Sequence, residues 1–252
     1  MSATLFEELD YRPSPIGMLS LRRRRRSADD VDIYEIKLDD GYLMSSLFTA
    51  GEIALADRGL AELGGRDLDV VVGGLGLGYT AMAALACRNV RTLVVVEAIP
   101  EVIEWHRRHL LPLGEALTND PRARLVCGNF FDMAAAGGNF EPEHPRRHYD
   151  AILVDIDHSP RHVLHPANAA FYKVAGLLAL ADKLVPDGVF ALWSTDPPDE
   201  EFLARLQAVF ATARADIVEF DNPYRSAVAL NTIYVARKNA PSGSAAGVAD
   251  GR

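Results

Sequence analysis

Residues 70–80 read Val70-Val71-Val72-Gly73-Gly74-Leu75-Gly76-Leu77-Gly78-Tyr79-Thr80. An apolar, β-branched run stops at glycines spaced two apart, and residues 81–86 continue with a helical composition. A second apolar run, residues 93–96, is closed by Glu97. Strand, glycine turn, helix, strand and acid, in this order, are typical of a nucleotide-binding βαβ unit.

Outward from this unit, the chain alternates between strand and helix patterns. Strands are expected at 68–72, 93–97, 124–127, 151–155, 189–193, 216–220 and 232–236, and helices at 79–87, 100–109, 167–184 and 199–211. This alternation predicts an α/β fold, a Rossmann-like, doubly wound and mostly parallel sheet of seven strands. The last two strands lack a helix between them, so we expect one antiparallel strand at the end. Residues 186–188, Pro-Asp-Gly, predict a tight turn into the fifth strand.

The chain divides into three regions. Residues 1–50 carry short β-type runs around the turn signal Asp39-Asp40-Gly41, which predicts a small N-terminal β-hairpin region. Residues 51–238, beginning with a helix at 51–63, form the predicted Rossmann-like domain, and residues 239–252 form an expected disordered tail. The basic run at 22–26 is interpreted as one strand of a hairpin, with alternate arginines on opposite faces.

Composition narrows the class of protein. The chain has 252 residues, enough for a full core, and a net charge of −9, which argues against nucleic-acid binding and fits a cationic or neutral small substrate. No apolar run approaches the ~20 residues of a membrane helix, so no membrane association is expected. The N-terminus has no signal-peptide pattern. Cys87 and Cys127 are interpreted as buried thiols, which suits a cytoplasmic location.

The glycine loop and the acid after the second strand predict a nucleoside site. Gly74, Gly76 and Gly78 let the backbone pass close to a ligand, because a β-carbon at these positions would clash. Glu97 offers two oxygens to the hydroxyls of a ribose. The segment also contains Gly76-x-Gly78-x-x-Ala81, which leaves an NAD site open. Two features favour an adenosyl group: the glycines follow the strand directly, and a second mononucleotide-binding half is missing.

The residues after the third strand are candidates for contacts to adenine. Asn129 has both a donor and an acceptor for the edge of the base. Phe130 or Phe131 could stack on the ring, although both are equally well explained as core residues.

The segment Asp155-Ile156-Asp157-His158-Ser159-Pro160 ends the fourth strand. Ligands of open α/β sheets bind outside the carboxyl ends of the strands, so Asp155 is expected beside the glycine loop. Asp155, Asp157 and His158 together could bind an amine or take its proton. The alternative is an Asx-type turn with solvated side chains.

A metal site is not expected from the histidines of this segment. The candidates are His158, His162 and His165, but Pro160 and Pro166 prevent a helical pair of ligands. No cysteine or glutamate completes a recognisable ligand spacing.

Taken together, these motifs resemble the spermidine synthase family, within the class I S-adenosylmethionine-dependent methyltransferase-like fold. The resemblance runs from about Asp39 to Arg237. It rests on residues 73–78, Val96-Glu97, Asp120-Pro121-Arg122, Gly128-Asn129, residues 149–155, Phe171-Tyr172 and Pro186-Asp187-Gly188.

The resemblance implies transfer of an aminopropyl group from decarboxylated S-adenosylmethionine to an amine such as putrescine, with Asp155 as the catalytic aspartate. The sequence departs from the family's pattern in three places. Leu77 stands where the family has an acid in the glycine loop, residues 155–160 differ from its Asp-Ser-Ser-Asp-Pro motif, and Met44-Ser45-Ser46 replace an expected glutamine. Asp157 or His158 could stand in for the second aspartate of the motif.

Three functions therefore remain open. The first is aminopropyl transfer, and the second is methyl transfer from intact S-adenosylmethionine, which Leu77 favours. The third is an adenosyl-binding module without catalysis. In the first two the sulfonium nucleoside is a co-substrate and the partner is a small-molecule amine or another small acceptor, with no metal. Family members are often dimers, so a homodimer is one expectation.

Overall fold

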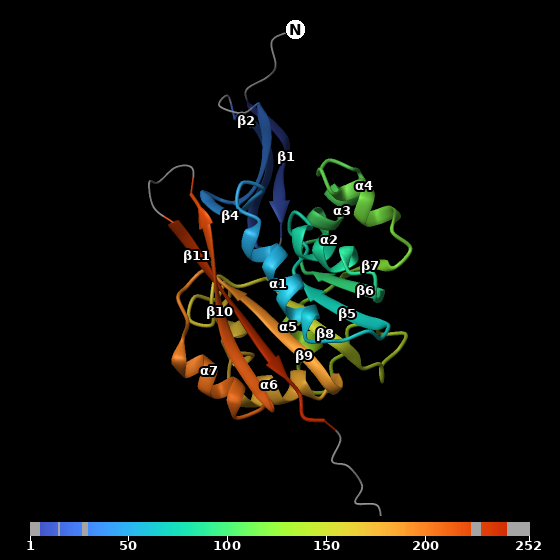
Figure 1. The fold of residues 1–252 in the computed structure, drawn as a ribbon. Helices are drawn as coiled ribbons and strands as arrows, with labels where there is room; N and C mark the ends of the chain where they lie inside the picture. Colours follow the sequence, from blue (N-terminus) through green and yellow to red (C-terminus); the bar gives the residue numbers. More distant parts are fainter. Residues whose placement is uncertain (1–5, 15, 27–29, 223–227, 241–252) are drawn as a thin grey trace, which may run out of the picture.

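The computed structural model describes residues 6–14, 16–26, 30–222 and 228–240. Within them the chain forms two β-sheets (Figure 1). The smaller is an antiparallel sheet in the order β1-β2-β3-β4, made of β1 (Phe6–Ser14), β2 (Gly17–Arg26), β3 (Val31–Leu38) and β4 (Gly41–Ser45). The predicted N-terminal hairpin region is thus a sheet of four strands. Most of the expected disordered tail, residues 241–252, lies outside the described residues.

The larger sheet has seven strands in the order β10-β11-β9-β8-β5-β6-β7. Its strands are β5 (Leu68–Gly73), β6 (Val90–Glu97), β7 (Ala123–Cys127), β8 (Tyr149–Val154), β9 (Leu184–Ser194), β10 (Thr212–Asp221) and β11 (Val228–Arg237). The five strands from β9 to β7 are mutually parallel. The last strand, β11, pairs antiparallel with both β9 and β10, which confirms the predicted mostly parallel sheet with an antiparallel last strand.

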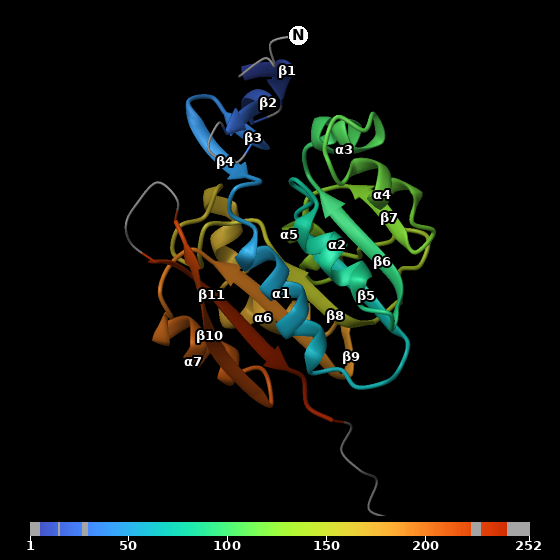
Figure 2. The same ribbon diagram turned by 45° about the horizontal axis from the view of Figure 1, so that its top comes forward.

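Helices cover both faces of this sheet, as expected for strands that are apolar on both sides. They are α1 (Ala50–Ala61), α2 (Tyr79–Ala86), α3 (Pro100–Arg107), α4 (Gly114–Asn119), α5 (Phe130–Ala134), α6 (Val174–Ala181) and α7 (Glu200–Gln207), with a 3-10 helix at Pro166–Ala170. In Figures 1 and 2, α1 and α2 lie on one face, and α6 and α7 lie on the other.

Alternation along the strands divides the core between these two faces. Val70 and Val72 pack on the side of α1, α2 and α3, where the N-terminal sheet adds Leu19 and Leu21. Val71 points to the other side, where aromatic residues such as Phe190 and Phe202 pack with α6 and α7. Successive residues of β5 face opposite sides of the sheet, and both sides are covered. The run is therefore apolar throughout.

Three expectations about local structure are corrected. The single helix expected at 167–184 is divided, because residues 166–170 are a 3-10 helix and α6 begins only at Val174. The short helices α4 and α5 did not show in the sequence pattern. The Pro-Asp-Gly segment at 186–188 lies within β9, where the register against β8 shifts and Asp187 has a positive φ of 63°.

The basic run forms the end of β2, which confirms that it is a strand. Arg22 pairs with Glu8 of β1 at 3.5 Å, whereas Arg24 pairs with Glu35 of β3 at 2.8 Å. All five arginines are half-buried. Cross-strand ion pairs therefore account for this run.

The N-terminal sheet is fixed to the larger sheet through α3. The indole N–H of Trp105 donates to Asp10 at 2.6 Å, and Arg12 pairs with Glu104 at 2.9 Å. Figure 2 shows this sheet above the beginning of α1. The N-terminal sheet therefore lies at the carboxyl ends of the parallel strands β5 and β8.

Two further expectations concern membrane association and the burial of the two cysteines. None of the helices in the described part of the chain is both long and apolar enough to span a membrane. Cys87 is half-buried, and Cys127 is exposed at the end of β7, so the interpretation of both cysteines as buried thiols is wrong. Cys127 is exposed because β7 is the edge strand of the sheet.

Candidate active site

The glycine loop connects β5 to α2, at the point where the strand order reverses. Gly74, Gly76 and Gly78 have positive φ angles of 94°, 46° and 92°, which side chains rarely adopt. A β-carbon on Gly74 would overlap the carbonyl oxygen of Asp155, and one on Gly76 would overlap the side chain of Met44. The loop therefore requires glycines both for its backbone and for its neighbours.

Glu97 holds the glycine loop in place. One carboxylate oxygen accepts the backbone N–H groups of Leu75 at 3.1 Å and Gly76 at 3.4 Å, and the other accepts that of Ile99 at 2.9 Å. Burial raises the pKa of this carboxyl group, and hydrogen bonds from backbone N–H groups, that of Ile99 first, oppose the rise. The structure thus places Glu97 at the loop, as the spacing predicted. Its binding of a ribose stays a prediction.

Two side chains that the sequence analysis did not assign also contact the loop. The Nε2 of His106 lies 2.8 Å from the carbonyl oxygen of Gly76, so this nitrogen carries the proton. The thioether sulfur of Met44 accepts the backbone N–H of Leu77 at 3.1 Å. Met44 belongs to the segment Met44-Ser45-Ser46, near which the resemblance implies a glutamine, and β4 brings it onto the loop. This segment therefore contacts the glycine loop, but it does so through a thioether and not through the amide of a glutamine.

Asp155 follows β8 and lies directly beside the glycine loop. Its backbone N–H donates to Gly73 at 2.8 Å, and Oδ2 of its side chain accepts the hydroxyl of Thr80 at 2.8 Å. Burial raises the pKa of this carboxyl group, and the bond from Thr80 opposes the rise. The adjacency that the sheet topology predicted for Asp155 and the loop is confirmed.

A second carboxylate, Glu52, senses the charge of Asp155. It belongs to the first turn of α1 and is only 9% exposed. Burial and the charge of Asp155 both raise the pKa of Glu52. The sequence gives no sign that Glu52 belongs to the site. Thr49-Ala50-Gly51-Glu52 is a capping-box pattern, which predicts that Glu52 caps the beginning of a helix. In the structure the side chain of Thr49 makes no capping bond.

Asp157 and His158 are placed differently from Asp155. Oδ1 of Asp157 accepts the backbone N–H of Leu164 at 2.6 Å and the side-chain amide of Asn168 at 2.9 Å, and Oδ2 accepts the hydroxyl of Tyr172 at 2.8 Å. Asp157 is almost completely buried, and His158 is exposed. The contacts of Asp157 favour a structural role in holding the segment after β8.

Asn129 and Phe130 begin α5 at the end of β7. Oδ1 of Asn129 caps the helix by accepting the N–H groups of Phe131 and Asp132. Phe130 is buried against Gly73, stacked on Phe140 at 5.2 Å between ring centroids. These contacts favour the interpretation of Phe130 as a core residue, and a contact to adenine stays a prediction for both side chains.

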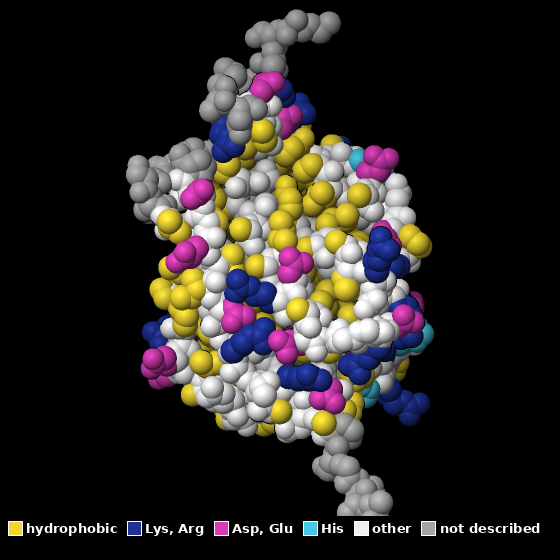
Figure 3. All heavy atoms as spheres, viewed as in Figure 1, with side chains coloured by type: hydrophobic (Ala, Val, Ile, Leu, Met, Phe, Trp, Pro, Cys, Tyr) yellow, Lys and Arg dark blue, Asp and Glu magenta, His cyan; other side chains and the backbone are white. Residues whose placement is uncertain are grey.

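The surface around this edge is mostly apolar. Figure 3 shows hydrophobic side chains gathered in the upper half of the view, below the N-terminal sheet, and charged side chains mainly in the lower half. Two surface hollows lie elsewhere: one of about 540 Å³ is lined by residues 143–147, and one of about 300 Å³ lies between α1 and α2. Neither is lined by a predicted site residue.

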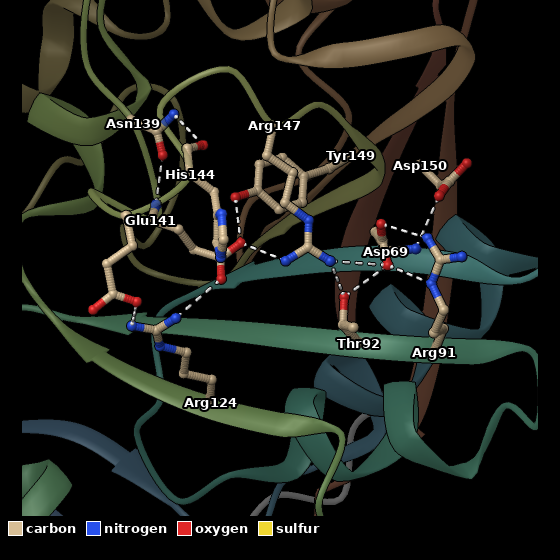
Figure 4. A network of polar contacts seen from close by, with 11 residues as sticks. Asp69, Arg91, Thr92, Arg124, Asn139, Glu141, His144, Arg147, Tyr149 and Asp150 are labelled. Atoms are coloured by element: carbon tan, nitrogen blue, oxygen red, sulfur yellow. Dashed lines mark hydrogen bonds and ion pairs between the residues drawn. The ribbon is translucent and has the colours of Figure 1, made fainter.

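The opposite edge of the sheet carries a polar network (Figure 4). Arg147 lies at its centre, 2.6 Å from Glu141, 2.6 Å from Thr92 and 3.0 Å from Asp69. Tyr149 donates its hydroxyl to Glu141 at 3.0 Å. Asp69, Thr92 and Tyr149 lie at the amino ends of β5, β6 and β8, so the network is remote from the glycine loop.

Metal-ligand geometry is also absent from the part of the chain that the structure describes. No group of three or more His, Cys, Asp or Glu side chains there is arranged to hold a metal ion. His162 instead contacts Asp196 at 2.9 Å.

Comparison with known proteins relates the chain to polyamine-synthesising enzymes. A scan against protein-family models finds no match. Polyamine aminopropyltransferase 2 of Pseudomonas aeruginosa is 28% identical over 153 residues, which cover 57% of this chain and 40% of the relative. The matched segment thus spans less than half the length of this curated relative.

Solved structures share the fold over almost the whole chain. Spermidine synthase from Thermotoga maritima has a TM-score of 0.68 at 20% identity, covering 93% of this chain and 73% of the other. A spermidine synthase in complex with the transition-state analogue AdoDATO gives the same values. A probable spermidine synthase from Corynebacterium glutamicum has a TM-score of 0.63 at 17% identity, covering 90% and 79%. The chain has a spermidine synthase-like fold.

Proposed function

We propose that this protein is an aminopropyltransferase that moves an aminopropyl group from decarboxylated S-adenosylmethionine to a primary amine such as putrescine. The observation that carries the proposal is the position of Asp155, a half-buried carboxylate directly beside the glycine loop. The similarity to a polyamine aminopropyltransferase supports it, as does the fold shared with a spermidine synthase bound to AdoDATO.

The glycine loop supports binding of the nucleoside. Its backbone is held by hydrogen bonds to Glu97 and to His106. No side chain caps the N-terminus of α2 after Gly78, which leaves this helix end to interact with a ligand. Each carboxylate oxygen has more than one lone pair, so Glu97 can accept a ribose hydroxyl in addition to the backbone N–H groups that it holds.

The proposed reaction is a direct displacement at carbon. The lone pair of the amine forms a bond to the aminopropyl carbon attached to sulfur, while the carbon–sulfur bond breaks and its electron pair returns to sulfur. The positive sulfonium becomes a neutral thioether, and the product is a secondary ammonium group. Because a protonated amine has no lone pair, Asp155 orients the substrate amine and accepts one of its protons before the attack. Atoms and charge therefore balance without a further reactant.

The raised pKa of Asp155 suits it to this role. An alkylamine has an ordinary pKa near ~10 and a carboxylic acid one near ~4, so proton transfer between them is unfavourable by about 6 units. Burial raises the pKa of Asp155 and narrows this gap. Each unit is equivalent to about 1.4 kcal/mol.

The test is turnover with defined substrates, followed by mass spectrometry of the products. Wild-type protein incubated with decarboxylated S-adenosylmethionine and putrescine is expected to form spermidine and methylthioadenosine. Asp155→Asn should bind the nucleoside normally and lose about 100-fold or more in turnover. Asp182→Asn, at an exposed position after α6, is the matched control and should be unchanged. Near-normal turnover by Asp155→Asn would exclude this assignment.

Methyl transfer from intact S-adenosylmethionine is the second candidate, and one observation favours it. Leu77 is completely buried in the apolar core, so the loop provides no charge for the aminopropyl ammonium group. Calorimetric titration with both donors distinguishes the two functions. Tighter binding of the carboxylated donor, with a methylated product, would replace the first proposal by the second.

A further inference from the structure

Both polar groups of the peptide bond between Gly76 and Leu77 are held by side chains from distant elements. The carbonyl oxygen of Gly76 accepts the Nε2–H of His106 at 2.8 Å, and the N–H of Leu77 donates to the sulfur of Met44 at 3.1 Å. This peptide is trans, so its C=O and N–H groups point in opposite directions. His106 and Met44 therefore contact it from opposite sides, and both hydrogen bonds require the same orientation of the peptide.

His106 is a polar side chain at a completely buried position of α3. Its exposed fraction is 0%, and its Nδ1 receives no hydrogen bond from the described residues. Burial lowers the pKa of the imidazole, and the bond to Gly76 opposes the fall, so the ring is neutral. A buried polar atom without a partner is costly, and an apolar side chain would avoid this cost. The contact that sets the imidazole apart from an apolar side chain is the bond from Nε2 to Gly76.

Close packing keeps the imidazole of His106 at the glycine loop. A β-carbon on Gly78 would come within 3.0 Å of Cε1 of the imidazole. The next helix, α4, packs closely on the same residue, since a β-carbon on Gly114 would come within 2.8 Å of the carbonyl oxygen of His106. The ring therefore has little freedom to turn away from Gly76.

The two elements that hold this peptide, α3 and β4, belong to parts of the structure that contact each other. Trp105 of α3 donates to Asp10 of β1 at 2.6 Å, and Arg12 of β1 pairs with Glu104 of α3 at 2.9 Å. Strand β1 lies in the same four-stranded sheet as β4. The N-terminal sheet thus acts on the glycine loop both directly, through β4, and indirectly, through α3.

The orientation of this peptide decides which polar group the glycine loop presents to a ligand. Gly76 has a positive φ of 46° and no β-carbon, so the peptide that follows it can rotate at low cost when nothing holds it. Half a turn would exchange the carbonyl and the N–H. A loop that samples both orientations binds a ligand less tightly, because only the fraction in the correct orientation is competent.

We propose that His106 and Met44 are positioning residues, which fix the Gly76–Leu77 peptide in the orientation that binds the sulfonium nucleoside. This assignment rests on the proposed binding of such a nucleoside at the glycine loop and adds to it the residues that hold the loop. Neither side chain takes part in the transfer step. Their loss should therefore weaken nucleoside binding and leave the chemical step unchanged.

The probe is methylthioadenosine, titrated calorimetrically into the full-length protein. His106→Leu removes the donor to Gly76 and should weaken binding by about 5- to 20-fold, the effect of one hydrogen bond. His106→Gln keeps an N–H donor at about the reach of Nε2 and should stay within about threefold of the wild type. Ile103→Val, at a buried position of the same helix, is the matched control and should bind as the wild type does.

The second bond is tested in the same way. Met44→Leu should weaken binding by about 2- to 5-fold, whereas Met18→Leu, half-buried in the same sheet, should not. Because both bonds need one orientation of the peptide, the double variant of His106 and Met44 should be no more than about twofold weaker than His106→Leu. Losses that multiply would show that the two residues act separately and would overturn the proposal.

Turnover separates positioning from a merely structural role. In His106→Leu the KM for the sulfonium donor should rise, and kcat at saturation should stay within about twofold. A fall in kcat with an unchanged KM, unchanged affinity in His106→Leu, or an equal loss in His106→Gln would overturn the inference while leaving the proposed function intact. If the wild type binds neither methylthioadenosine nor a sulfonium nucleoside, the proposed function itself fails.

A further measurement needs no variant. Nitrogen NMR of wild-type protein labelled in its histidines should find His106 as the neutral tautomer with its proton on Nε2, both with and without methylthioadenosine. A proton on Nδ1 instead would remove the bond to Gly76 and would overturn the inference.

Discussion

The hydroxyl of Thr80 donates a hydrogen bond of 2.8 Å to Oδ2 of Asp155, joining the first turn of α2 to the end of β8. This bond stabilises the charged form of the carboxylate and opposes the effect of burial on the pKa of Asp155. It therefore influences the pH at which Asp155 can act as a base.

Replacing Thr80 by Val is expected to raise the pKa of Asp155 further. Because the proposed base acts only when ionised, the acidic limb of the kcat/KM profile should move to higher pH by about one unit. Activity at pH 9 should approach that of the wild type, and Thr80→Ser should restore the profile. An acidic limb that stays in place, or moves to lower pH, would contradict this role for the bond.

The Glu52–Asp155 pair is expected to make the stability of the protein pH-dependent. Since both pKa values are raised in the folded state, folding retains protons that the unfolded chain releases above about pH 4. This contribution is complete below about pH 4 and is lost as the pH rises through the raised values.

Glu52→Gln should therefore melt higher than the wild type at pH 8.5 by about 3–6 °C, equivalent to about 1–2 kcal/mol, and the difference should vanish near pH 4. Thermal denaturation at several pH values measures this effect. Asp57→Asn, at an exposed position of the same helix, should show no such trend. A melting temperature for Glu52→Gln below that of the wild type at pH 8.5 would be inconsistent with an uncompensated buried pair.

Asp157 tests whether the second acid after β8 binds substrate or holds the fold. Asp157→Asn places an amide where the carboxylate accepts bonds from Leu164, Asn168 and Tyr172, so the free energy of unfolding should fall by about 1–3 kcal/mol. Tyr172→Phe removes one of these donors and should cost less. Urea denaturation and the KM for putrescine are measured together; a changed KM with unchanged stability would indicate a ligand role instead.

Glu141 tests the network at the amino ends of the strands. It is 3% exposed in its side chain, and it pairs with both Arg124 and Arg147. Glu141→Gln should reduce the free energy of unfolding by about 2–4 kcal/mol, because Arg147 keeps its charge with one partner fewer. KM values should be unchanged, since the network is remote from the glycine loop.

Glu143→Gln is the control for this prediction, because Glu143 also pairs with Arg124, at 2.9 Å, but is 69% exposed. Its effect should stay below about 0.5 kcal/mol. If urea denaturation gave equal losses in the free energy of unfolding for Glu141→Gln and Glu143→Gln, burial of Glu141 would not be the cause of its effect.

The sequence by itself determined the repeated strand–helix order, the glycine loop and the place of Asp155. These follow from local physics: a run that is apolar throughout forms a strand buried on both faces, and parallel strands bring their carboxyl ends to one edge. Glu97 could be placed at the loop for the same reason. The N-terminal region was expected as β-structure, and the arginines of β2 were recognised as part of a strand.

Only the tertiary structure decided which side chains meet at that edge. Glu52 is 103 positions before Asp155, and its sequence context is that of a helix cap. Asp157 is turned into the fold, Phe130 packs under Gly73, and Met44 arrives from the other sheet. Residue periodicity encodes which face of an element is buried, but the neighbours on that face depend on how distant elements pack against each other.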